Sequence, residues 1–144
     1  MSKEGERLRA EFYLQKIAFY DTRIESNNNR IKDFKDSAVN KTSNLSPNKV
    51  QSSSGMQKME SAVVSYSDLD RMVKILERKR QEIIDDICSL EPSESIVLYK
   101  KYVDGVELVE MEDVLKKSQS WIYKKHGSGV RKIQEILDAR EKVG

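Results

Sequence analysis

A cluster of positive charges lies in the stretch KKSQSWIYKKHGSGVRKI, which spans residues 116–133. The positive residues are Lys116, Lys117, Lys124, Lys125, Arg131 and Lys132. No Asp or Glu occurs among them, although the whole chain of 144 residues has a formal net charge of only +2. Lysine and arginine bind phosphate groups, and the amides and hydroxyls between them can contact base edges. The chemistry that these residues could carry is therefore the binding of nucleic acid.

The residues around the cluster predict a helix, a tight connection and a second helix. Residues 107–115 carry apolar side chains three and four positions apart, which predicts the first helix. Lys116 and Lys117 form the connection. Ser118 stands where an N-cap belongs, because its hydroxyl can accept a hydrogen bond from the start of the second helix. The residues expected to face inward are Leu108, Met111, Leu115, Ile122, Val130, Ile133 and Leu137. This is the spacing of a helix-turn-helix, whose second helix can enter the major groove of DNA.

The second helix has an outward side that predicts two kinds of DNA contact. Its outward residues are Ser118, Gln119, Ser120, Tyr123, Lys124 and Gly127. Gln119 suits adenine, and Lys124 suits guanine or phosphate. Phosphate contacts are expected from Lys116, Lys117, Lys125, Arg131 and Lys132. The alternative is a solvated basic side that binds no ligand.

The other chemically distinctive residues of the chain favour structural roles. Trp121 either lies over a sugar-phosphate edge or packs beside Leu115, and packing is the favoured interpretation. His126 is expected on the buried side as a structural residue, and Cys88 as a small buried hydrophobic residue. The sequence has no metal-ligand spacing, phosphate loop or catalytic triad, so we expect no enzyme, metal or cofactor.

Two long helices are predicted upstream of this module. In residues 6–37, apolar residues recur in alternating steps of four and three, and Asn27 is the polar member of this series. In residues 56–90, apolar residues form one side of the predicted helix, which Arg80 interrupts. The first helix offers a seam of Tyr13, Ile17, Tyr20, Ile24, Ile31 and Phe34. Residues 39–55 are rich in Ser and Asn and predict a flexible linker. We expect an antiparallel hairpin whose surplus of apolar residues makes the protein a homodimer.

The amino-acid composition predicts the fold class, and Pro92 predicts the boundary between two parts of the chain. Only two Pro and six Gly occur, and charged residues make up 35% of the chain, which favours an all-α protein. Pro92 separates the hairpin, residues 1–90, from a module at residues 91–144, and Ser93 is expected to cap a helix at 93–103. That helix should bury Ile96, Val97, Tyr99 and Val103. No apolar run is long enough to span a membrane, so a cytoplasmic protein is expected.

The segment YVDGVELVEMEDVLKKSQSWIYKKHGSGVRKI resembles the helix-turn-helix of region four of bacterial sigma factors. It is most similar to the phage-encoded, sigma-like transcriptional regulators of Gram-positive prophages, of the autolysin-regulatory-protein type. The matching positions are Tyr102, Asp104, Gly105, Ser118, Tyr123, His126 and Gly127. The segment VQSSSGMQKME, at residues 50–60, is also similar to the linker that leads into the second helix of that family. The resemblance implies an all-α fold, promoter DNA as ligand and host RNA polymerase as a further partner, in the cytoplasm of a bacterial host.

The chain departs from that family at four positions in the module. Glu112 replaces a small residue, Lys116 a Gly of the turn, Ser120 a common Arg or Lys, and Lys125 a hydrophobic residue. A Lys in the left-handed conformation of the turn would cost about 1 kcal/mol. The expected function is a DNA-binding transcriptional regulator. The alternatives are a helical adaptor that binds polymerase or a phage protein without DNA, and a DNA-packaging accessory protein.

Overall fold

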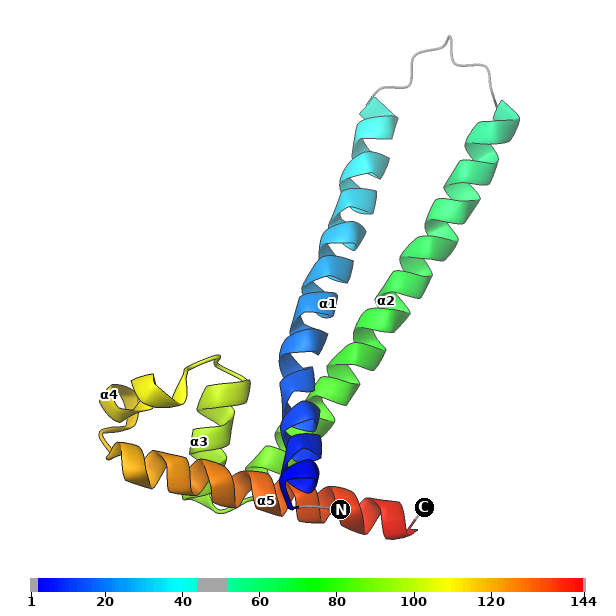
Figure 1. Ribbon diagram of the computed structural model, residues 1–144. Coiled ribbons are helices and arrows are strands. Elements are labelled where there is room, and N and C mark those ends of the chain that lie inside the picture. The colour runs from blue at the N-terminus through cyan, green and yellow to red at the C-terminus, as the bar shows by residue number, and fades with distance from the viewer. Residues whose placement is uncertain (1–2, 44–51, 144) are drawn as a thin grey trace. The chain divides into compact units, whose positions relative to one another are not determined.

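The computed structural model describes the backbone of residues 3–43 and 52–143, and the side chains of residues 9–37 and 66–143. Every regular element in these ranges is a helix, which confirms the predicted all-α class (Figure 1). The elements are α1 (Lys3–Ser43), α2 (Ser52–Cys88), α3 (Pro92–Tyr102), the 3₁₀ turn η1 (Leu108–Glu110), α4 (Met111–Leu115) and α5 (Gln119–Val143).

The chain divides into two compact units that differ from the predicted domains. The larger unit consists of residues 1–20 and 79–144, and the smaller unit of residues 21–78. The predicted boundary at residue 90 is therefore not a boundary between compact units. The physical reason is that the start of α1 and the end of α2 supply apolar side chains to the same core as α3 and α5.

The predicted linker is wrong at both ends. Residues 39–43 continue α1, and residues 52–55 begin α2, despite their polar composition. Extending an existing helix adds one backbone hydrogen bond for each residue fixed, so polar residues without Pro can prolong it. The remaining part of the predicted linker, residues 44–51, lies outside the described residues.

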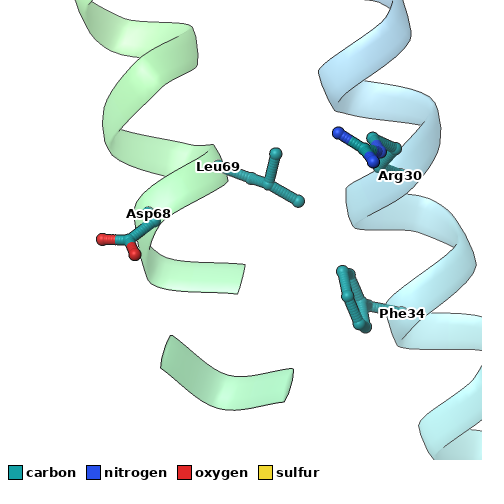
Figure 2. Close-up of a pocket in the computed structure, with 4 residues that line it drawn as sticks. All are labelled: Arg30, Phe34, Asp68 and Leu69. Carbon is teal, nitrogen blue, oxygen red and sulfur yellow. The ribbon is translucent and has the colours of Figure 1, made fainter. Parts of the chain in front are cut away.

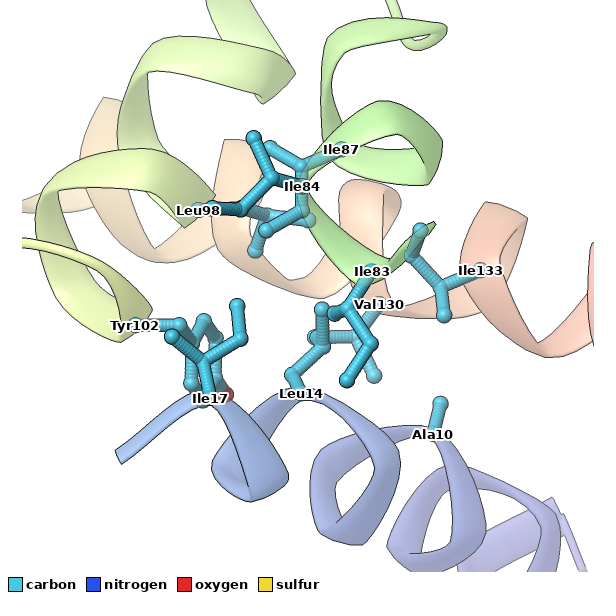
Figure 3. Close-up of a cluster of buried hydrophobic side chains, with 10 residues drawn as sticks. All are labelled: Ala10, Leu14, Ile17, Ile83, Ile84, Ile87, Leu98, Tyr102, Val130 and Ile133. Carbon is cyan, nitrogen blue, oxygen red and sulfur yellow. The ribbon is translucent and has the colours of Figure 1, made fainter. Parts of the chain in front are cut away.

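The main core of the larger unit joins four helices (Figure 3). Its buried side chains are Ala10, Leu14 and Ile17 from α1, Ile83, Ile84 and Ile87 from α2, Leu98 and Tyr102 from α3, and Val130 and Ile133 from α5. Burying such a side chain contributes about 1.5–3 kcal/mol relative to leaving it in water. The core of the module at 91–144 is thus completed by the end of α2 and by residues of α1, which lie far from it in sequence.

A polar network closes one edge of this core. Arg140 donates two hydrogen bonds to the buried Asp86, from Nη2 to Oδ1 at 2.6 Å and from Nη1 to Oδ2 at 2.9 Å. Tyr13 also donates its hydroxyl hydrogen to Asp86. Burial, and then this hydrogen bond, raise the pKa of Tyr13 to about 12. A residue of α1 and a residue of α5 therefore satisfy the same carboxylate of α2.

The start of α3 differs from the prediction. Glu91 occupies the N-cap position, Pro92 is the first helical residue, and Glu91 makes no side-chain cap, so Ser93 is not the cap. Proline suits the first helical position because its φ is already helical. The backbone N–H that proline lacks would have no partner within the helix at this position. Val97 and Leu98 are fully buried on the inward side of this helix, whereas Ile96, which was predicted to be buried, is 43% exposed.

The segment between α3 and α5 is broken rather than one helix. The turn at Gly105 has a φ of +73°, as expected for a helix stop. The predicted helix at 107–115 consists of η1 followed by α4. Met111 is fully buried and forms a second, smaller core with Val97 and Ile122.

Candidate nucleic-acid interface

Helix α5 is held in place by one buried side. The buried residues are Ile122, His126, Gly129, Val130, Ile133 and Gln134. Gly129 permits close packing on α3, because a Cβ at this position would lie only 2.9 Å from Leu98 Cδ1. Because this side of α5 is packed, the residues on its opposite side face solvent.

The beginning of α5 has the predicted cap. The Trp121 amide donates to Ser118 Oγ at 3.2 Å, and the Ile122 amide donates to the Ser118 carbonyl at 3.1 Å. Lys116, which ends α4, adopts the left-handed conformation with φ 56° and ψ 42°. The predicted cap is confirmed, and Lys116 has the conformation that favours glycine.

Replacing Lys116 by Gly is expected to raise the free energy of unfolding of the larger unit by about 1 kcal/mol, because glycine adopts a positive φ without steric cost. Denaturant unfolding followed by the fluorescence of Trp121, the only tryptophan, measures this. Lys117→Gly is the matched control, since Lys117 has no positive φ. Equal effects of the two substitutions would contradict the prediction.

The predicted basic side of α5 is exposed and not neutralised. Lys116, Lys117, Lys124 and Arg131 are exposed, and Lys125 is half-buried. None of these five makes an ion pair with any residue whose side chain the structure describes. Lys100 and Lys101 of α3, by contrast, pair with Asp104 at 3.2 Å and with Glu107 at 3.8 Å. The charge of this surface is therefore available to an anionic ligand.

Lys132 differs from the other predicted phosphate-binding residues. Its Nζ lies 2.6 Å from Oε1 of Glu94, whose side chain is only 1% exposed, and 3.7 Å from Glu91. Ser128 donates a second hydrogen bond to Glu94. Burial raises the pKa of Glu94, but the hydrogen bonds from Lys132 and Ser128 outweigh it and hold that pKa below its ordinary value. Lys132 thus compensates a buried carboxylate that sequence reasoning missed.

The side chain of Gln119 is directed toward the preceding elements and not outward, where a residue that contacts bases would point. Its Nε2 donates to the carbonyl of Val109 at 2.8 Å and to Glu112 Oε2 at 3.3 Å. The side chain is half-buried against the preceding elements. Gln119 therefore connects the start of α5 to η1 and α4, while Ser120, Tyr123 and Lys124 remain exposed.

Trp121 and His126 have the structural roles that were favoured, whereas Cys88, which was predicted to be buried, is exposed. Trp121 packs against the smaller core beside Leu115, with Lys117 Nζ 5.4 Å from its ring centroid. His126 is buried, and its Nε2 lies 2.9 Å from the hydroxyl of Tyr102. The two rings stack with centroids 5.8 Å apart. This pair links α3 to α5, a partner that spacing alone could not identify.

Three of the six residues of the predicted dimer seam pack against other helices of the same chain. Ile17 is fully buried in the main core, and Tyr13 and Tyr20 pack against that core. Ile17 cannot form a seam between two copies, because other helices of the same chain already cover it. Tyr13 and Tyr20 are half-buried by contacts within the chain. Ile24, Ile31 and Phe34 are half-buried in the smaller unit, where dimerisation stays a prediction.

The smaller unit contains an open cleft of about 290 Å³ between its two helical segments (Figure 2). Its lining residues are Arg30 and Phe34 from α1 and Asp68 and Leu69 from α2. Phe34 and Leu69 point into the space between the helices (Figure 2). Its sparse lining provides neither a metal site nor a constellation of catalytic groups.

Among the residues that the structure describes, no group of three or more His, Cys, Asp or Glu side chains is placed to hold a metal ion. None of the helices in the described ranges has an apolar stretch that could cross a bilayer.

Comparisons of the chain with protein-family models, curated proteins and solved structures gave no match.

Proposed function

We propose that this protein binds double-stranded DNA through the exposed basic side of α5 and acts as a transcriptional regulator of a phage or prophage. The observation that carries the proposal is the group of exposed cations at Lys116, Lys117, Lys124 and Arg131, with no ion pair among the described residues. A nearly neutral chain gains little stability from such a group, whereas duplex DNA attracts it strongly.

The placement of α5 supports the same proposal. The helix is Ser-capped, follows a short connection after α4, and buries its inward side against α3. An α-helix fits the major groove, and its exposed residues then reach base edges while neighbouring cations hold phosphates. The resemblance to sigma-like prophage regulators supplies the regulatory and phage part of the proposal.

Affinity for duplex DNA is expected to fall as salt concentration rises, because bound phosphates release counterions. Arg131→Ala should lower the slope of log affinity against log salt by about one, through loss of one phosphate contact. Fluorescence anisotropy of labelled random-sequence duplex over a salt series measures both. Lys32→Ala, an exposed cation of the smaller unit, is the control and should leave the slope unchanged. An unchanged slope for Arg131→Ala would remove this side of α5 from the interface.

A protein-docking function is the second candidate, and one observation favours it. Val109 and Val114 are 64% and 51% exposed, and they lie beside the acidic residues Glu110 and Asp113. An apolar and acidic surface suits a basic protein partner such as a segment of RNA polymerase. Binding of a protein that survives Arg131→Ala but is lost in Val109→Asp would support this adaptor function.

A further inference from the structure

Tyr123 is the exposed aromatic residue of the basic side of α5. Its side chain is 50% exposed, whereas Trp121 packs against the smaller core and Tyr102 is buried. Its hydroxyl makes no hydrogen bond with any residue whose side chain the structure describes. On a surface otherwise made of charged side chains, this half-exposed ring offers an apolar contact and a hydroxyl to a ligand bound there.

The neighbours of Tyr123 leave the ring accessible. Ser120 and Gly127 lie three residues before it and four residues after it, which places them on the same side of the helix. Gly127 has no side chain, although glycine inside a helix costs about 1 kcal/mol relative to alanine. The surface beside the ring therefore carries no large side chain at these two positions, and the next residue in sequence, Lys124, is exposed.

We propose that Tyr123 contacts the C5 methyl group of a thymine in the major groove and so makes the protein prefer a T·A pair at that position. The inference rests on the proposed DNA-binding function. Among the four bases only thymine presents a methyl group in the major groove, and an apolar side chain recognises it by direct contact. The adjacent thymine O4 can accept a hydrogen bond from the phenolic hydroxyl.

Two other uses of the ring fit the surroundings less well. Contact with the phosphate backbone would use only the hydroxyl of Tyr123 and leave its apolar ring without a partner, whereas Lys117 and Arg131 attract phosphate by charge. Stacking on a base requires an unpaired strand, since the faces of bases are covered in a duplex. In the groove of a duplex the ring meets base edges, where the methyl group is the apolar feature.

The test uses the full chain and a duplex selected from a random pool at near-physiological salt. The selected duplex is then prepared with deoxyuridine at each thymine in turn, because uracil pairs as thymine does and lacks only the methyl group. At one thymine the wild-type protein should bind the deoxyuridine duplex about fourfold more weakly, the effect of one buried methyl group. Tyr123→Ala should bind both duplexes equally, and Tyr123→Phe should retain the difference.

The outcomes separate this inference from the function on which it rests. If the wild type binds duplex DNA but no deoxyuridine substitution weakens binding, or if Tyr123→Ala keeps the difference, thymine recognition by Tyr123 is wrong while DNA binding stands. If no duplex is bound in a salt-dependent way, both are wrong. If only single-stranded DNA is bound, base stacking replaces the methyl contact. Unfolding followed by Trp121 fluorescence shows that each variant is folded.

Discussion

Replacing Ile17 by Ala is expected to lower the free energy of unfolding of the larger unit by about 2–5 kcal/mol. Ile17 is fully buried among side chains of several helices, and its removal leaves a cavity that rigid helices fill only partly. Denaturant unfolding followed by Trp121 fluorescence reports this unit, because Trp121 lies in α5. The effect should appear although Trp121 and Ile17 are more than 100 residues apart.

Lys16→Ala is the matched control, since Lys16 is exposed and adjacent in sequence. It should change the free energy of unfolding by less than about 0.5 kcal/mol. If Ile17→Ala has a small effect on stability and light scattering shows a change from dimer to monomer, Ile17 instead lies in an interface between two copies. A large effect independent of protein concentration supports the intramolecular core.

Reversing two charges on α5, in the double variant Lys124→Glu and Arg131→Glu, is expected to weaken DNA binding by roughly a thousandfold. Each reversal turns about 1 kcal/mol of attraction to a phosphate in water into a similar repulsion. The two changes together amount to about 4 kcal/mol, which is close to a thousandfold in affinity. Anisotropy titration with labelled duplex at low salt measures the loss.

Unfolding of this double variant should be nearly unchanged, because both side chains are exposed and lack ion pairs among the described residues. The control is Lys32→Glu with Arg78→Glu, which changes the net charge equally within the smaller unit. If the control weakens binding as much as the α5 variant, net charge alone governs affinity, and the assigned interface is wrong.

The sequence predicted well those features that depend on local chemistry. Ser118 caps α5 because a hydroxyl next to free amide groups is a short-range arrangement. The exposure of Lys124 and Arg131 followed from helical periodicity. Each of these features is decided within a few residues of the chain.

Features that depend on distant partners were beyond prediction. The pairing of Lys132 with Glu94 joins residues 38 positions apart, so composition could not distinguish it from an available cation. Gln119 looked like an outward residue until the broken helix at η1 placed the Val109 carbonyl beside it. The seam at Ile17 had correct periodicity, but periodicity does not say whether the covering helix belongs to the same chain.

DNA binding through α5 is tested most directly by a nuclear magnetic resonance titration of the isotope-labelled full chain with duplex DNA. The proposed interface predicts that backbone amide signals between Lys116 and Arg131 shift progressively, and that those of residues 21–37 and 66–78 stay in place. The shifts should shrink as salt is added, because counterion release weakens the complex. Shifts confined to residues 106–114 or to the smaller unit, or no shifts at saturating DNA, would contradict DNA binding by α5.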